Sequence, residues 1–562
     1  MNAALIAVIV LALYFLGYRF YSKFLAQKVF RLSDDEVTPA HTLKDNVDYV
    51  PTNKHVLFGH HFSSIAGAAP IIGPAIAVFW GWLPAIIWVV LGTIFMGAVH
   101  DFSALVVSAR RQGRSVGDLA GTIINSRART LFLLIVFFLI FFVLAVFAYA
   151  IAALFVAFPS SVFPINFEII VAVVIGVLLY KKGVPLLWPS IVALILLYVT
   201  IWVGTKFPIE APAIMGSPQV TWIIFLLVYS FIASVLPVWV LLQPRDYINS
   251  HQLFVGLAIL ILGLFVAHPT MQAPAINTNT AGAVPIFPFI FVTIACGAIS
   301  GFHGLVSSGT SSKQLDKMTH ARHIGYGGML GEGTLAMIAT LAVAAGISRA
   351  DWLTHYHDWQ AAANGGITNF VLGASTFLTA LHIPELLSKT FISVVVISFA
   401  ATSLDTATRI QRLIIGELGS AYKIKPLENR YIGAALAVIP SLLLALLAQD
   451  PGRGPGSGGF LLWPLFGATN QLVGGLTLLV ATIFLWRMGQ PVIYTAIPMV
   501  FLIFMTTASM ILNFRAFSEN PLLLVLSAII LALEVWLILE AVVVFNHQRN
   551  RPGGVPKEVA AD

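Results

Sequence analysis

Long apolar stretches, each near the length of a membrane-crossing helix, alternate along this chain with short polar connections. A helix needs roughly 20 mostly apolar residues to cross the hydrocarbon of a bilayer, and segments such as 130–167 and 247–312 contain no Asp, Glu, Lys or Arg. A transmembrane barrel would show alternating strands of about ten residues instead. The pattern therefore predicts an all-α polytopic membrane protein with about 15 transmembrane helices. The predicted spans are 2–22, 62–80, 83–108, 131–157, 167–182, 185–206, 221–242, 252–268, 286–312, 328–347, 386–408, 431–448, 460–486, 491–513 and 521–546.

Composition agrees with this pattern and narrows the class of protein. Hydrophobic residues make up 58% of the 562 residues, and charged residues only 10%. Soluble domains carry about 25% charged residues, so a cytosolic enzyme, a disordered chain and a nucleic-acid binder are excluded. The single cysteine allows no internal disulfide. The net charge of +7 is interpreted as the basic excess that cytoplasmic loops of membrane proteins carry.

The distribution of basic residues predicts an orientation. If the N-terminus lies outside, only Lys206, Arg349, Lys389, Arg453 and Arg515 of the 31 Lys and Arg residues face outward. This bias predicts an N-out, C-in topology. The predicted organisation is an N-terminal helix with a cytoplasmic connection (1–55), a ten-helix core (56–415), a four-helix C-terminal bundle (416–548) and a mobile cytoplasmic tail (549–562).

The longest external connection, 348–385, also has a predicted structure of its own. It contains Asn364-Gly365-Gly366, a run of turn-forming residues. The segment is predicted to form a compact external loop or lid.

Proline and glycine interrupt two of the predicted spans. In 59–84, Pro70 removes a backbone donor, and Gly67 and Gly73 permit non-helical dihedrals. Unwound backbone at membrane depth persists only where protein or a water-filled cavity satisfies it. This segment is therefore predicted to be a broken helix that lines a binding site, with a merely kinked helix as the alternative. In 230–249, Pro237 interrupts the span, and Arg245-Asp246 at its inner end indicates either a gate or a solvated helix end.

Hydroxyl-bearing and titratable side chains mark further candidates. Ser307, Ser308 and Thr310 lie in a Gly-rich stretch. Their hydroxyls are predicted either to bind a hard cation or to allow close packing of helices. Ionisable groups inside a membrane usually face a cavity or a partner, which makes Asp101 a candidate proton carrier. Asp405 and Arg409 are four residues apart on one helical face and suit an ion pair. His60, His61, His100 and His303 recur without metal-ligand spacing, so their role stays open, as does that of Glu332, Glu534 and Glu540.

The spacing of the broken helices predicts an inverted repeat. The span 221–242 is the sixth counted from 62–80, and five helices per block is an odd number, so the second block inserts upside down. Two inverted five-helix blocks, each starting with a discontinuous helix, form a known transporter design that binds its substrate near the bilayer midplane. In this scheme 286–312 is the eighth core helix and faces the unwound part of the first.

Seven motifs in unbroken order resemble the carbon starvation protein A (CstA) family. They are Gly-His-His-Phe-Ser-Ser-Ile-Ala-Gly (59–67) with Gly-Pro (73–74), Ala-Val-His-Asp-Phe (98–102), Gln-Pro-Arg-Asp-Tyr-Ile-Asn (243–249), Ser-Gly-Phe-His (300–303) with Ser-Ser-Gly-Thr (307–310), Ile-Gly-Tyr-Gly-Gly-Met-Leu (324–330), Thr-Ser-Leu-Asp-Thr-Ala-Thr-Arg (402–409) and Trp-Pro-Leu-Phe-Gly-Ala-Thr-Asn-Gln (463–471).

The resemblance implies a protein of the bacterial inner membrane, linked to carbon starvation, that imports peptides or pyruvate, with pyruvate:proton symport in some members. It also implies a LeuT-like core of five plus five inverted helices, here with one N-terminal and four C-terminal extra helices. The chain looks shorter than the longest members of the family.

These observations give a mechanistic hypothesis for a secondary active transporter that is not an enzyme. N–H groups at the ends of half-helices attract a carboxylate, which pyruvate and peptide C-termini both present. A cation would bind at the hydroxyls together with carbonyls near Ala66, or a proton would bind Asp101; Na⁺ and H⁺ both stay open, and no other cofactor is expected. The candidate site residues are Ala66, Gly67, Pro70, Gly73, Ser234, Pro237 and Trp239 for substrate, Asp101, Ser307, Ser308 and Thr310 for the coupling ion, and Arg245, Asp246, Asp405 and Arg409 for gating.

Two alternatives stay open at this point. A channel or nutrient-sensing receptor would use the same fold without coupling, and a haem- or metal-binding membrane protein would use the histidines. Besides its substrate and the lipid bilayer, no partner is predicted, and the oligomeric state is not predicted.

Overall fold

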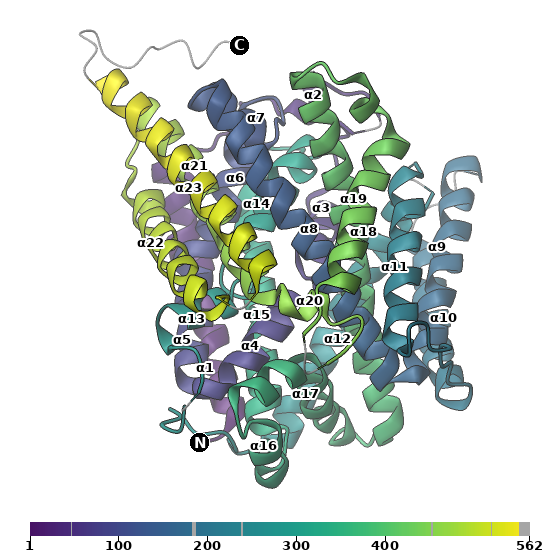
Figure 1. Cartoon of the computed structure of the whole chain (residues 1–562). Coiled ribbons are helices and arrows are strands. Elements are labelled where there is room, and N and C mark those ends of the chain that lie inside the picture. The colour runs from purple at the N-terminus through teal and green to yellow at the C-terminus, as the bar shows by residue number, and fades with distance from the viewer. Residues whose placement is uncertain are drawn as a thin grey trace.

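The protein is an all-helical bundle in which nearly every predicted span is a helix (Figure 1). The computed structural model describes residues 1–46, 48–182, 187–237, 240–280, 282–450, 453–518 and 520–549. The predicted tail from residue 550 onward lies outside these ranges.

The first half of the chain contains twelve α-helices in the described ranges. These are α1 (Ala3–Leu16), α2 (Pro39–Thr42), α3 (Lys54–Ile65), α4 (Ala69–Ala77), α5 (Trp82–Gly92), α6 (Ala98–Arg110), α7 (Val116–Ile123), α8 (Ser126–Ala157), α9 (Val162–Lys182), α10 (Leu187–Lys206), α11 (Pro218–Val235) and α12 (Leu242–Ala267).

The second half contributes eleven more within those ranges. These are α13 (Ile286–Thr293), α14 (Gly301–Gly309), α15 (Gly327–Ala345), α16 (Arg349–His355), α17 (Trp359–Thr379), α18 (Glu385–Ala421), α19 (Arg430–Leu447), α20 (Gly458–Leu461), α21 (Trp463–Arg487), α22 (Ile493–Ala516) and α23 (Pro521–Arg549). Short π-helical turns extend α1 to Val29 and join α5 to α6.

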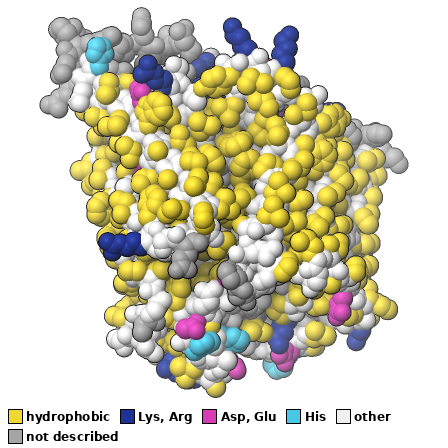
Figure 2. Space-filling view, in the orientation of Figure 1, with side chains coloured by type: hydrophobic (Ala, Val, Ile, Leu, Met, Phe, Trp, Pro, Cys, Tyr) yellow, Lys and Arg dark blue, Asp and Glu magenta, His cyan; other side chains and the backbone are white. Residues whose placement is uncertain are grey.

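The outer surface is that of a membrane protein. Figure 2 shows hydrophobic side chains covering the lateral face, with most charged side chains near its two ends. In the described part of the chain, 13 helices are long and apolar enough to cross a bilayer, or up to 14 when the bent pair α3–α4 counts as one. The predicted polytopic helical architecture is confirmed, whereas the count of fifteen and the N-out orientation stay predictions.

The first predicted broken helix is confirmed. α3 and α4 are bent by 52° across the break at 66–68, and Pro70 occupies the first turn of α4, where its missing N–H costs nothing. At Gly73 a Cβ atom would lie 2.2 Å from the carbonyl oxygen of Thr293. Only glycine allows α4 to approach the end of α13 this closely.

The second broken helix lies at 286–309, not at 221–242 as predicted. α13 ends at Thr293 and α14 begins at Gly301, so residues 294–300 cross the interior without helical structure. α11, in contrast, runs unbroken to Val235, and Pro237 lies in the connection to α12. The segment 286–312 is therefore the first helix of the second block rather than its third. Proline marked a helix end at 237, while the real break contains small residues such as Ala295, Gly297 and Ser300 and no proline.

The packing of the helices repeats itself when the two blocks are compared. α3 packs on α12 as α13 packs on α21, and α4 packs on α15 as α14 packs on α6. Likewise α8 contacts α11 as α18 contacts α19, and α12 contacts α18 as α21 contacts α8. The short helix α7 precedes α8 as α17 precedes α18, and these two lie at opposite ends of the molecule (Figure 1). This is the pattern of an inverted five-plus-five core, with α9 and α10 inserted as an additional helix pair.

The external segment 348–385 differs from the predicted loop. It forms α16 and the 21-residue helix α17, which packs against α4, α12, α15 and α18. Asn364-Gly365-Gly366 lies within α17 instead of forming a turn. A Cβ atom at Gly366 would lie 2.8 Å from Cγ1 of Ile76. The small residues thus let α17 lie close against α4.

Candidate functional site

The two helix breaks meet the rest of the core at its centre. A Cβ atom on Gly67 would lie 2.8 Å from Oγ of Ser403 on α18 and 3.1 Å from the ring of Phe147 on α8. Ser403 Oγ is buried and has no hydrogen-bond partner in the described part of the chain. The first break is therefore in direct contact with α8 and α18, and a polar oxygen faces it.

The second break is held by the Gly-Ala-Thr-Asn-Gln motif of α21. The side-chain oxygen of Asn470 accepts hydrogen bonds from the backbone N–H of Phe302 and from the hydroxyl of Ser300. The side-chain amide of Gln471 donates to the carbonyl of Phe291 at the end of α13. Asn470 and Gln471 thus satisfy polar groups that the break exposes on both half-helices.

A cavity of about 350 Å³ borders α3 and α14, the helices next to the two breaks. It is lined by Ser64, one turn before the break after α3, and by Leu305, just beyond the start of α14. Residues of α8 and α18 also line the cavity. Charged side chains surround its wider part, namely Asp48, Asp246, Lys313, Arg409, Arg412 and Glu417. This end carries α7, on the side predicted to be cytoplasmic.

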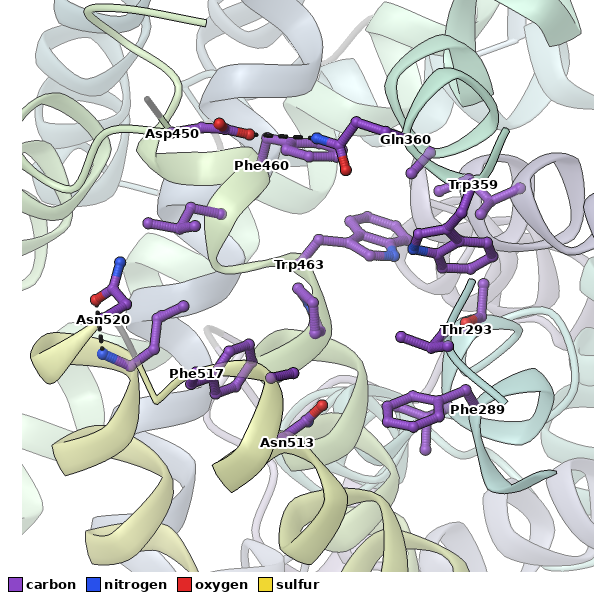
Figure 3. Close-up of a pocket in the computed structure, with 18 residues that line it drawn as sticks. Phe289, Thr293, Trp359, Gln360, Asp450, Phe460, Trp463, Asn513, Phe517 and Asn520 are labelled. Atoms are coloured by element: carbon purple, nitrogen blue, oxygen red, sulfur yellow. Dashed lines mark hydrogen bonds between the residues drawn. The ribbon is translucent and has the colours of Figure 1, made fainter. Parts of the chain in front are cut away.

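Other helices of the core pack more tightly. The space between α4, α8, α17 and α21 measures only about 30 Å³. Beside it lies a separate pocket of about 260 Å³ between α13, α17, α21 and α22. Figure 3 shows the aromatic side chains of Phe289, Trp359, Phe460, Trp463 and Phe517 around this pocket. Thr293, the last residue before the second break, also lines this pocket.

Four titratable side chains form a buried cluster beside the second break. Nδ1 of His100 and Nδ1 of His303 lie 2.7 Å and 2.9 Å from the two carboxylate oxygens of Asp101. Nε2 of His303 lies 3.0 Å from Oε2 of Glu332. All four side chains are at most 1% exposed. The sequence identified Asp101 as a candidate, but its partner His303 lies 202 residues further along the chain.

A second buried cluster contains two of the predicted gating residues. Nη1 of Arg245 lies 2.5 Å from Oδ2 of Asp405, and Nε lies 3.4 Å from Glu168 on α9. Tyr229 donates to the same Asp405 oxygen. Asp405 therefore pairs with Arg245 on α12, and the predicted pair with Arg409 is wrong, because the carboxylate points to α12 rather than along its own helix.

The other two predicted gating residues face the cavity. Asp246 lies 3.2 Å from Nδ1 of His60, and Arg409 lines the same space. Their role in gating stays a prediction.

The predicted cation ligands lie apart from Ala66. Ser308 Oγ donates to the carbonyl of Gly304 and accepts from the N–H of Val116 on α7. Ser307 is buried within α14, and Thr310 follows the end of that helix and lines the cavity. Ser308 thus contacts Val116 on α7 and, through its backbone carbonyl, Ser108 on α6. The role of the three hydroxyls as cation ligands stays a prediction. Within the described ranges no group of three or more His, Cys, Asp or Glu residues could hold a metal ion.

Only some of the predicted substrate residues lie at a helix break. Ala66, Gly67, Pro70 and Gly73 lie in or directly after the first break. Ser234 instead lies near the end of α11, where its carbonyl accepts a hydrogen bond from Arg412. Pro237 follows that helix, and Trp239 lies outside the described residues. The structure thus places the second break at 294–300, while Ser234 belongs to α11.

The two carboxylates of α23 whose role the sequence left open each accept a hydrogen bond from another helix or its cap. Glu534 accepts a hydrogen bond from Thr507 on α22, and Glu540 accepts one from Asn125 beside α8. They attach α23 to its neighbours.

Two helix breaks inside an inverted ten-helix core are the architecture of a membrane transporter. The family model described as "Carbon starvation protein CstA" matches residues 2–354 and 353–509. The chain belongs to this family, and it is a multi-pass protein of the bacterial inner membrane.

Curated relatives match most of the chain. It is 33% identical over 565 residues to "Peptide transporter CstA" of Helicobacter pylori, covering 91% of this chain and 82% of the relative. It is 32% identical over 601 residues to "Pyruvate/proton symporter BtsT" of Escherichia coli, covering 92% and 82%.

Solved structures of transporters resemble the fold more loosely. The structure of MhsT in complex with L-phenylalanine gives a TM-score of 0.48 at 13% identity and covers 88% of this chain and 98% of that chain. The manganese transporter of Eremococcus coleocola gives 0.48 at 14% identity, with 89% and 99% covered. The assignment of the core therefore rests on the packing described above.

Proposed function

We propose that this protein is a proton-coupled symporter that imports a small carboxylate, pyruvate or a short peptide, by alternating access. The observation that carries the proposal is the cavity of about 350 Å³ that borders α3 and α14, the half-helices next to the two breaks, while the space between α4, α8, α17 and α21 measures about 30 Å³. A channel would be open on both sides. The names of the curated relatives include a peptide transporter and a pyruvate/proton symporter, which supports this substrate class.

The substrate carboxylate binds between the two breaks. The N-termini of α4 and α14 both begin at a break, and the backbone N–H groups of a helix start attract an anion. The contact of Gly67 with α8 and α18 adds the scaffold as the third wall of the site. The proposed binding residues are therefore Ala66, Gly67, Pro70 and Gly73 together with 294–300 in place of 234–239.

The core that moves comprises helices of both blocks. In our proposal α3–α6 and α13–α15 form a bundle that rocks against α8, α11, α18 and α19, with α12 and α21 at its two sides. This division places α19 and α21 in the transporter core, and it replaces the predicted boundary at residue 415. Arg409 and Asp246 line the inward cavity, where they attract and release a charged substrate. With the predicted N-out topology the cavity opens to the cytoplasm.

Substrate exchange across proteoliposomes tests the proposal without assuming a driving force. Vesicles loaded with unlabelled pyruvate, or with an unlabelled dipeptide, are diluted into the labelled compound. The proposal predicts exchange of at least one compound, and it predicts that the same compound raises the thermal unfolding midpoint of the detergent-purified protein. Absence of exchange and of stabilisation for every carboxylate tested would refute this substrate class.

Two substitutions separate the candidate coupling ions. Asp101→Asn is expected to abolish proton-driven uptake. Ser308→Ala with Thr310→Ala is expected to leave the ion dependence unchanged, since both hydroxyls lie away from Ala66. A Na⁺ dependence that disappears in the latter variant would instead favour the predicted cation site.

A further inference from the structure

The buried cluster beside the second break contains two carboxylates and two histidines. With His303 charged and His100 neutral, one negative charge is left uncompensated. We propose that Glu332 carries the coupled proton and that His303 connects it electrostatically to Asp101. This assignment rests on the proposed function, and it differs from the sequence-based hypothesis in which Asp101 itself carries the proton.

The geometry fixes Asp101 as the permanently charged member. Its two oxygens each face an imidazole nitrogen, Nδ1 of His100 at 2.7 Å and Nδ1 of His303 at 2.9 Å. Both imidazoles can donate a hydrogen bond only if Asp101 accepts at both oxygens, as an ionised carboxylate does. Hydrogen bonds from two such donors favour the ionised form of a carboxylate.

Glu332 is in the opposite situation. Its single polar contact within the described ranges is Nε2 of His303 at 3.0 Å, and its side chain is fully buried. An ionised carboxylate that is buried with one partner is costly, because desolvation is only partly offset. Glu332 therefore binds a proton in the absence of further positive charge.

Counting protons gives two states of the cluster. When Asp101 and Glu332 are both ionised and His303 is positively charged, with His100 neutral, the cluster carries a net charge of −1. When one further proton binds an Oε atom of Glu332, the net charge is zero. The proton enters from water on one side and leaves to water on the other, so one proton accompanies one substrate molecule per cycle.

The position of the cluster couples this charge to the substrate. His303 lies in the first turn of α14, three residues after Ser300 at the end of the break. Asp101 lies on α6 and Glu332 on α15, the helices that pack on α14 and α4 respectively. A negative charge within about 10 Å weakens the binding of a carboxylate by roughly tenfold at an effective dielectric constant near 20. The substrate is thus bound well only after Glu332 has taken up its proton.

A route for the proton leads from the cavity through His61. Nδ1 of His61 lies 2.8 Å from the hydroxyl of Ser311, which follows the cavity-lining Thr310. The His61 ring is buried, and it lies within electrostatic reach of Asp101 and His303. His61 thus contacts Ser311 and interacts with two members of the cluster.

The remaining groups around Glu332 do not compete for the proton. Tyr14 on α1 and Cys296 in the second break interact electrostatically with Glu332. Each donates its hydrogen bond elsewhere, Tyr14 to the carbonyl of Val89 and Cys296 to Ser300. In the described part of the chain, His303 and Asp101 also interact electrostatically with Glu332.

Exchange and accumulation in proteoliposomes test the assignment with Glu332→Gln. Wild-type exchange of the carboxylate substrate is expected to fall roughly tenfold as the pH rises through the titration of Glu332. In Glu332→Gln the exchange no longer depends on pH in this way, and accumulation driven by an inside-alkaline pH gradient falls to simple equilibration. The matched control is Glu534→Gln, which removes another buried membrane carboxylate, on α23 outside the core, and is expected to accumulate substrate as the wild type does.

The outcomes distinguish this assignment from the proposed function. If the wild type exchanges no carboxylate, the proposed function fails. If the wild type exchanges but Glu332→Gln still accumulates substrate against a pH gradient, the assignment is overturned and the proposed function stands. Glu332→Asp serves where Glu332→Gln does not fold. It keeps a titratable group one methylene shorter, so the pH midpoint of exchange is expected to move, and an unchanged midpoint would overturn the assignment.

Discussion

A methyl group added at Gly67 is expected to destabilise the inward-facing conformation specifically. In this conformation the backbone of the first break lies against α8 and α18, and a Cβ atom at this position would lie 2.8 Å from Ser403 Oγ and 3.1 Å from the Phe147 ring. If the bundle rocks against these helices during transport, the contact exists in only one of the two states. Gly67→Ala then penalises that state and leaves the other unaffected.

The size of the effect follows from the contact. A distance of 2.8 Å is shorter than side chains tolerate, so either Ser403 or the break must shift. Overpacking of this kind costs about 1–3 kcal/mol, which changes the ratio of inward- to outward-facing molecules by roughly 5–150-fold. The double variant Gly67→Ala/Ser403→Ala lacks the clashing oxygen. It is expected to bring the ratio of inward- to outward-facing molecules most of the way back to the wild-type value.

Thiol accessibility measures this ratio directly. The chain has a single cysteine, Cys296, which is buried and is replaced by serine to keep its hydrogen bonds. Thr406 lines the inward cavity, so Thr406→Cys reports the open state when inside-out vesicles are treated with a membrane-impermeant maleimide. Gly67→Ala is expected to slow this labelling, and the double variant to recover it. Equal labelling rates in all three backgrounds would show that the Gly67 contact does not change during transport.

Three further substitutions test individual contacts. Asp405→Asn leaves Arg245 without its closest ionised partner in the interior and is expected to cost about 3–5 kcal/mol, seen as a lower thermal unfolding midpoint in detergent; a midpoint equal to that of the wild type would contradict the pairing. Gly73→Ala places a Cβ atom 2.2 Å from a backbone oxygen of α13. Because α4 and α13 belong to the same moving bundle, this variant is expected to lower the yield of folded protein without favouring either conformation. A normal yield together with altered thiol labelling would contradict a contact inside the bundle. Asn470→Ala removes the acceptor of the Phe302 N–H and is expected to cost about 1 kcal/mol and to weaken substrate binding, whereas binding equal to the wild type would show that the start of α14 needs no cap.

Much of the architecture follows from hydrophobicity alone. Helices such as α8 and α23 are uninterrupted apolar runs longer than a bilayer requires, so their existence and approximate ends are predictable from the sequence. The break near Gly67 is predictable too, since prolines and glycines within an apolar span leave backbone groups that only a protein interior or a cavity satisfies.

The second break shows the limit of this reasoning. Pro237 in an apolar span indicates a break, but proline equally follows a helix end, and here α11 ends two residues earlier. The real break at 294–300 contains no proline. Its signal is a run of small and hydroxyl-bearing residues, which by itself indicates helix packing or cation binding just as well. Recognising it requires the partner, Asn470, which lies about 170 residues away in the chain.

The buried clusters were only half predictable for the same reason. Asp101, Asp405 and Arg245 stood out because charges are rare in membrane helices. Their partners could not be chosen by local spacing. Asp405 has Arg409 one helical turn away, yet it pairs with Arg245, which is 160 residues distant. Side-chain direction decided the pairing, and direction depends on how α12 and α18 pack.

Accumulation of substrate against its gradient is the most direct test of the account. Purified wild-type protein in sealed liposomes is given an inside-alkaline pH gradient and labelled pyruvate or a labelled dipeptide outside. Coupled alternating access predicts an internal concentration above the external one, and this excess disappears when a protonophore is added. Equilibration at the external concentration, independent of the pH gradient, would contradict coupling and favour a channel.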